Sequence, residues 1–88
     1  MVRIVLPDAT PRDALDDAAA DLGLSLVNIV VKTEAHPAQL IYVTPGRSAQ
    51  VHLVDEGAGG ALCYVVQGEA AEEARWSEAL RARFEVAS

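Results

Sequence analysis

The sequence predicts an α+β fold in a single domain spanning residues 1–88, with the element order β-α-β-β-β-β-α. Two observations carry this prediction. Three strand-length apolar runs, separated by turn-forming residues, lie between residues 39 and 67, and an amphipathic segment with helical spacing lies on each side of them. Because short turns join consecutive runs, we expect a mostly antiparallel sheet of about five strands with the two helices packed on it.

The amino-terminal part of the chain predicts one strand and one helix. Residues 2–6 form a mainly apolar run that stops at a proline, as a short strand would. A helix is expected over 11–22, because Thr10 suits the N-cap and Pro11 suits the first helical position. Leucine and alanine recur in this segment with the spacing i, i+3, i+4 and i+7, and Gly23 then supplies a C-terminal stop.

The middle of the chain predicts four strands. Residues 24–31 are rich in β-branched side chains and favour a strand that is covered on both faces. After a polar connection come three apolar runs, at 39–44, 49–54 and 61–66, separated by a Pro-Gly turn and a Gly-rich turn. Runs bounded in this way are typical of an antiparallel meander.

The last element predicted is an amphipathic helix from Glu69 to about Phe84. Its largest apolar side chains, Trp76, Leu80 and Phe84, are spaced at i, i+4 and i+8 and therefore share one stripe. Acidic residues near its start and arginines near its end complement the helix dipole. We expect this stripe to pack on the sheet.

Turn lengths predict the register of the meander, with Thr44 opposite Ala49 and Val54 opposite Ala61. Side chains of a strand alternate between faces. One face then holds Leu40, Tyr42, Val51, Leu53, Leu62, Tyr64 and Val66. The other holds Ile41, Val43, Gln50, His52, Val54, Ala61, Cys63, Val65 and Gln67. The first face is the more apolar, and the helices are expected there, although one helix on each face is the alternative.

The second face is apolar at six of its nine positions, whereas a sheet face open to water alternates to polar residues. If both helices lie on the first face, another subunit must cover the second. The sequence therefore predicts a homodimer, and the expected interface consists of Ile41, Val43, His52, Val54, Cys63 and Val65.

Composition excludes several classes of function. The net charge of −6 at pH 7 argues against binding to nucleic acid or to an anionic membrane, since both need clusters of Lys and Arg. The sequence contains no membrane-spanning run, and the six residues before Pro7 are too short for the apolar region of a signal peptide, so we expect none. Its single cysteine, Cys63, allows no internal disulfide, so we expect a cytoplasmic protein.

Candidate chemistry is sparse. His52 and Cys63 are expected as cross-strand neighbours, but the middle of a strand offers no oxyanion donor, and a buried thiol beside a histidine is the favoured interpretation. Asp13, Asp17 and Asp21 form an i, i+4 ladder that predicts a solvated helix face or, more weakly, a docking face for a basic protein. We recognise no catalytic set, no metal-ligand spacing and no cofactor motif.

The sequence thus favours a non-enzymatic interaction module that self-associates, in the role of an adaptor, an inhibitor or immunity-type protein, or an accessory protein. The alternative is a small-ligand-binding or minor enzymatic domain. Its pocket would lie near Tyr42, Tyr64 and Trp76, since the two tyrosines share one row of the predicted sheet below the tryptophan.

Overall fold

The structure is a computed structural model that describes residues 1–7, 10–55 and 62–84. The elements are β1 (Val2–Val5), α1 (Arg12–Asp21), β2 (Ser25–Val30), β3 (Ala38–Val43), a short 3-10 turn η1 (Pro45–Arg47), β4 (Ala49–Asp55), β5 (Leu62–Gly68) and α2 (Ala70–Phe84). This order confirms the predicted β-α-β-β-β-β-α arrangement.

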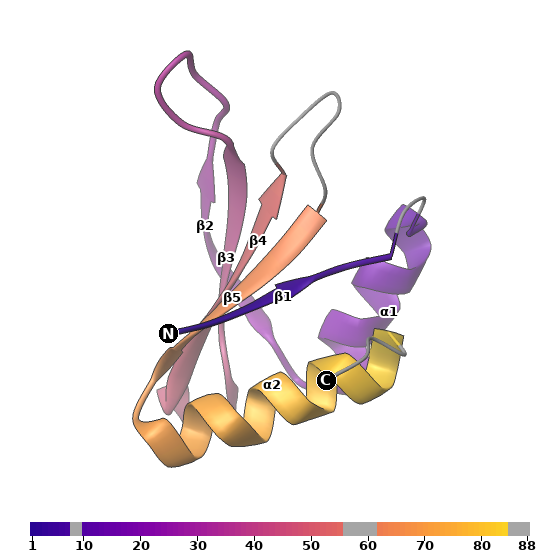
Figure 1. Cartoon of the computed structure of the whole chain (residues 1–88), viewed down its shortest axis with the longest axis vertical. Helices are drawn as coiled ribbons and strands as arrows, with labels where there is room; N and C mark the ends of the chain where they lie inside the picture. The colour runs from indigo at the N-terminus through magenta and orange to yellow at the C-terminus, as the bar shows by residue number, and fades with distance from the viewer. Residues whose placement is uncertain (8–9, 56–61, 85–88) are drawn as a thin grey trace.

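The five strands form one sheet in the order β1-β5-β4-β3-β2, and every neighbouring pair is antiparallel. The first two strands of the chain therefore lie at opposite edges of the sheet, and α1 connects them (Figure 1). Both helices lie on the same side of the sheet (Figure 1). We call the covered side the helix face and the opposite side the helix-free face.

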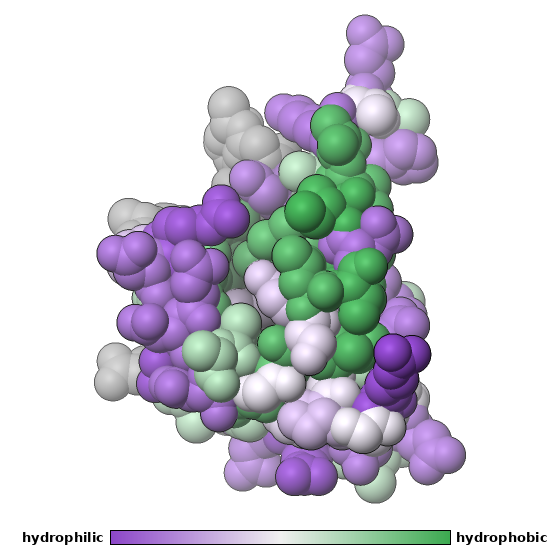
Figure 2. All heavy atoms as spheres, turned by 180° about the vertical axis from the view of Figure 1, so that it is seen from behind, coloured by the Kyte–Doolittle hydropathy of each residue, from purple (hydrophilic) through white to green (hydrophobic). Residues whose placement is uncertain are grey.

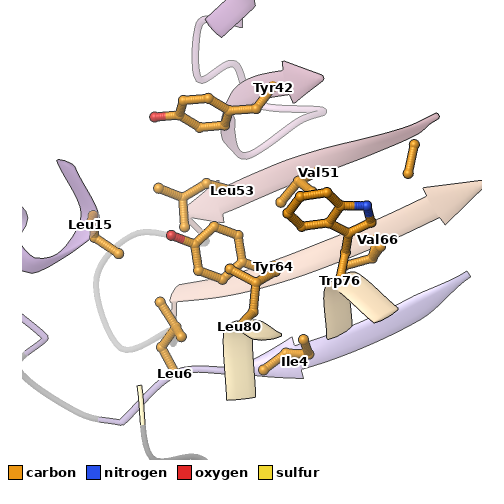
Figure 3. Packing of buried hydrophobic residues seen from close by; sticks show 11 residues of the cluster. Ile4, Leu6, Leu15, Tyr42, Val51, Leu53, Tyr64, Val66, Trp76 and Leu80 are labelled. Carbon is orange, nitrogen blue, oxygen red and sulfur yellow. The ribbon is translucent and has the colours of Figure 1, made fainter. Parts of the chain in front are cut away.

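The hydrophobic core lies between the helix face and the two helices. Leu15 of α1 and Trp76 and Leu80 of α2 pack against buried strand side chains (Figure 3). The strand residues of this core are Ile4, Tyr42, Ala49, Val51, Leu53, Tyr64 and Val66. Leu40 and Leu62 pack partly buried against it, so all seven meander residues assigned to the more apolar face contact the core.

The predicted register is confirmed for the first turn and wrong for the second. Tyr42 lies opposite Val51, as expected. Val54, however, lies opposite Cys63, which is a shift of two residues, because β4 continues to Asp55 and β5 begins only at Leu62. A shift of two keeps every side chain on its predicted face. Ala61, the predicted partner of Val54, is outside the described residues.

For α1, the predicted C-terminal stop is confirmed and the predicted N-cap is not. At the carboxyl end, Gly23 has a φ of +70°. The Leu24 N–H donates to the Ala19 carbonyl at 2.9 Å and the Gly23 N–H to that of Ala20 at 3.2 Å, which is a Schellman motif. The predicted N-cap is wrong, because the Thr10 hydroxyl donates to the Pro7 carbonyl at 2.6 Å and caps no helical N–H.

Glu72 fixes α2 relative to the sheet. Its Oε2 accepts a hydrogen bond from the Trp76 indole N–H at 2.9 Å and one from the Ser48 hydroxyl at 3.2 Å. Ser48 lies 3.0 Å from the hydroxyl of buried Thr44, which in turn accepts the Ala49 N–H at 2.9 Å. The carboxylate thereby links the first turn of α2 to the β3–β4 turn.

Replacing Gly23 by alanine should lower the free energy of unfolding by about 2 kcal/mol, because a side chain in the left-handed region costs roughly 1–2 kcal/mol and an added Cβ would meet Pro45 Cγ at 3.0 Å. Gly46→Ala is the matched control: φ is +75° there too, but nothing lies within 4 Å of the added Cβ. Urea unfolding should show the larger loss for Gly23→Ala. Equal losses would mean that the Pro45 contact carries no cost.

Ser77→Ala should raise the free energy of unfolding by about 1 kcal/mol. Ser77 is buried in α2 and its Oγ has no hydrogen-bond partner in the described structure. Removing an unpaired buried hydroxyl and gaining helix propensity both favour the folded state. Ser48→Ala, which removes hydrogen bonds to Thr44 and Glu72, should instead be destabilising. Thermal unfolding measures both changes, and a lower melting temperature for Ser77→Ala would contradict the prediction.

Candidate functional site

The helix-free face carries all six residues predicted as an interface, but it does not expose them equally. Cys63 and Val54 are already buried within the single chain, with 2% and 9% of their surfaces exposed. The β1 strand adds Val5 beside Cys63 and so extends this row of side chains. The remaining four are half-buried and accessible; they are Ile41, Val43, His52 and Val65.

His52 and Cys63 share the helix-free face but do not face each other. His52 lies opposite Val65, and Cys63 lies opposite Val54, so the predicted cross-strand pair is wrong by the same two-residue shift. The imidazole Nε2 is 3.1 Å from Oε1 of Gln50. Burial lowers the pKa of His52 from its ordinary value. A buried thiol and a histidine whose hydrogen-bond partner is an amide do not form an activated nucleophile.

The most exposed apolar surface lies on β2 and the residue after it. Leu26, Val27, Ile29 and Val31 have 48%, 51%, 59% and 74% of their surfaces exposed, and we call these four residues the β2 strip. Figure 2, which views the molecule from behind Figure 1, shows apolar side chains gathered in one stripe along the sheet.

The sequence prediction that residues 24–31 form a strand covered on both faces is therefore wrong within the single chain. The strand order puts β2 at an edge of the sheet. The helix α2 packs on β5 and β1, at the other edge of the sheet from β2. Within β2 only Val30 is even half-buried.

The three aspartates predicted as an acidic face are all exposed on α1. Asp21 is not free, because its carboxylate pairs with Arg83 of α2 at 2.8 Å. Asp13 and Asp17 remain as the open part of this face. In the described ranges, no three His, Cys, Asp or Glu side chains converge as metal ligands would.

The three aromatic residues predicted to line a pocket are part of the core instead. Tyr42, Tyr64 and Trp76 are 9%, 2% and 7% exposed. Burial, followed by the neighbouring Tyr42 hydroxyl and the Asp16 carboxylate, raises the pKa of Tyr64 well above its ordinary value. Figure 3 shows both tyrosine hydroxyls pointing toward the side of the core where Leu15 lies, away from Trp76.

A hollow of about 270 Å³ lies on the helix face, and none of these three aromatic residues lines it. Leu15, Leu40 and Leu53 line it together with Ile29 of β2, and Arg12 stands among its polar residues. Sequence reasoning missed this hollow. Its signal is the presence of large apolar residues at the β2 side of the helix face, where no helix residue of matching size is available to fill the space.

Acidification should destabilise the protein through His52. Well above pH 6.5 the histidine is neutral in both states and contributes nothing. As the pH falls below 6.5, the unfolded chain binds the proton first, because burial lowers the pKa of the folded histidine. The free energy of unfolding therefore decreases until folded His52 is protonated too.

Urea unfolding at pH 7.5 and pH 5.5 checks this prediction. His52→Gln should reduce the loss of stability between the two pH values. His36→Gln, which removes the other histidine from an exposed connection, should leave the loss in place. Equal pH dependence in wild type and His52→Gln would contradict the assignment.

Neither the ten-residue α1 nor the fifteen-residue α2, the helices of the described ranges, has the length and apolarity required to cross a bilayer. Comparison of the chain with protein-family models, with curated proteins and with solved structures finds no match. The interpretation of this surface therefore rests on its geometry and chemistry.

Proposed function

We propose that this chain is a non-enzymatic interaction module that self-associates through the uncovered apolar surface of its sheet. The observation that carries the proposal is the β2 strip. Four of the six exposed large apolar side chains of the described chain fall within residues 26–31. A contiguous apolar surface on a small soluble domain marks a site of association.

The helix-free face supports the same conclusion. Ile41 and Val43 of β3 neighbour β2 in the sheet and are half-buried, as is Val65 of β5. Because Leu26 and Ile29 of the strip lie opposite Tyr42 and Leu40 of the helix face, these half-buried side chains form a second apolar region on the other face of the sheet. A second copy could shield both regions, whereas the two helices are already committed to the opposite face.

As a module of this kind, the chain would act as an adaptor, an inhibitor or immunity-type protein, or an accessory subunit. We place it in the cytoplasm, because its single cysteine is buried and free, and small domains of oxidising compartments usually carry disulfides. The exposed Asp13 and Asp17 would favour a basic protein as a further partner.

The competing proposal is a small-ligand-binding or minor enzymatic domain. The hollow beside Leu15 and Leu40 is the observation that favours it, in place of a pocket near the buried aromatics. A ligand bound there would raise the melting temperature with increasing ligand concentration. A thermal-shift screen of small apolar carboxylates and amides would therefore distinguish the two proposals.

Light scattering at micromolar concentration tests the leading proposal. The measured mass should be twice the 9.3 kDa of one chain. Dilution should shift the mass toward that of one chain, since the association is reversible. A protein that stays monomeric at tens of micromolar would contradict self-association.

A further inference from the structure

We propose that two copies associate by pairing their β2 strands edge to edge, antiparallel, across a two-fold axis perpendicular to the sheet. This inference rests on the proposed function, because it specifies how the chain self-associates. Its product is one continuous sheet of ten strands. The inference begins from the position of β2 and is independent of the chemistry of the helix-free face.

One edge of β2 has no strand partner in the described structure. The sheet ends at β2, whose other edge is bonded to β3. The Ile29 N–H donates to Oδ1 of the adjacent Asn28 at 2.9 Å, a local contact that a partner strand could replace. Main-chain groups along an exposed edge are a template for another strand.

The two edges of the sheet differ in how they are protected. The β1 edge has only four residues, carries Arg3, and is followed closely by Pro7. The chain's amino terminus next to it is held in an ion pair with Glu73. Short length, charge and proline are the usual devices that prevent edge pairing.

The β2 edge lacks the charge and the proline. From residue 22 to residue 31 the chain contains no charged residue and no proline, and the side chains of the β2 strip are about half exposed or more. One protective device is present, a register shift between Leu26 and Asn28. Beyond it, Asn28 to Val30 pair regularly with β3, so a ladder to a second copy would centre on this stretch.

Charge favours a second copy as the partner. Lys32, the only lysine of the chain, follows one end of β2, whereas α1 precedes the other end with Asp17 exposed and Asp21 paired with Arg83. Antiparallel pairing brings each Lys32 toward the acidic end of the partner copy, and symmetry repeats this contact. The neutral strand between these ends allows two chains of net charge −6 to approach.

The proposed two-fold axis also determines how the apolar side chains of the two β2 strands are placed relative to each other. Ile29 lies opposite Leu40 and therefore projects on the helix side of the sheet. A two-fold axis perpendicular to the sheet keeps all four helices on one side. The two Ile29 side chains then meet beside the hollows of both copies and shield each other from water.

Cysteine cross-linking tests the geometry directly. In a Cys63→Ser background, single cysteines would be introduced at positions 28 to 31 and oxidised under mild conditions. Where the paired strands cross the two-fold axis, the Cα atoms of the same residue in the two copies lie opposite each other. Their separation falls within the roughly 4.4–6.8 Å that a disulfide requires. We expect a disulfide-linked dimer that peaks at one position and falls off on both sides.

Val5→Cys is the matched control, because Val5 is 52% exposed on the opposite edge strand. It should give no specific dimer. If Cys63→Ser is unfolded, the native Cys63 can be retained, since only 2% of its surface is exposed. Equal cross-linking at Val5 and in β2, or none in β2, would overturn edge pairing.

Light scattering of charged variants separates failure of this inference from failure of the proposed function. Ile29→Lys should raise the dissociation constant at least tenfold, because it places two like charges at the paired edges, and Val5→Lys should leave it unchanged. A dimer that survives Ile29→Lys but is lost on Val43→Lys would overturn edge pairing and retain self-association through the helix-free face. A monomeric wild type would overturn both.

Discussion

Two short helices must cover one face of a five-stranded sheet, and the rest of the structure depends on where they pack. The longer helix, α2, lies on β5 and β1. Burial therefore declines across the sheet: β4 and β5 hold most of the buried strand residues, β3 contributes only Tyr42, and β2 contributes none. The β2 strip and the hollow beside Leu40 are both consequences of this one-sided coverage.

Side-chain size explains why α1 does not make up the difference. Its apolar stripe contains two alanines between Leu15 and Leu22, so it presents little surface to the strands. Trp76 and Leu80 give α2 a far larger contact, and the hydrogen bond from the Ser48 hydroxyl to Glu72 helps to hold that helix in place. The core consequently forms under α2 and becomes thinner toward β2.

Local signals in the sequence predicted the helices and strands. Contacts between residues distant in sequence determine which strands pair and how deeply each strand is buried. Gly23 and the Pro-Gly turn mark element ends, and they were sufficient for the element order and the first hairpin register. The Gly-rich connection did not reveal that β4 extends to Asp55. The resulting shift of two residues kept each side chain on its predicted face, because side chains alternate along a strand.

No local signal indicates that β1 pairs with β5. That pairing buries Cys63 beside Val5 and leaves β2 at the edge, and it accounts for most of what sequence reasoning missed about the candidate site.

The wrong prediction for β2 is informative, because the sequence predicted an interior strand and the structure places it at an edge. Residues 24–31 have the composition of an interior strand, with no charge and many β-branched side chains, yet the single chain places this segment at an edge. Selection against aggregation usually removes such a composition from an open edge, as Arg3 and Pro7 illustrate at β1. Pairing of its outer edge with a second copy, as proposed above, would reconcile the composition of β2 with its position. In a ten-stranded sheet formed by two copies, β2 becomes an interior strand, which is the environment that its residues predict.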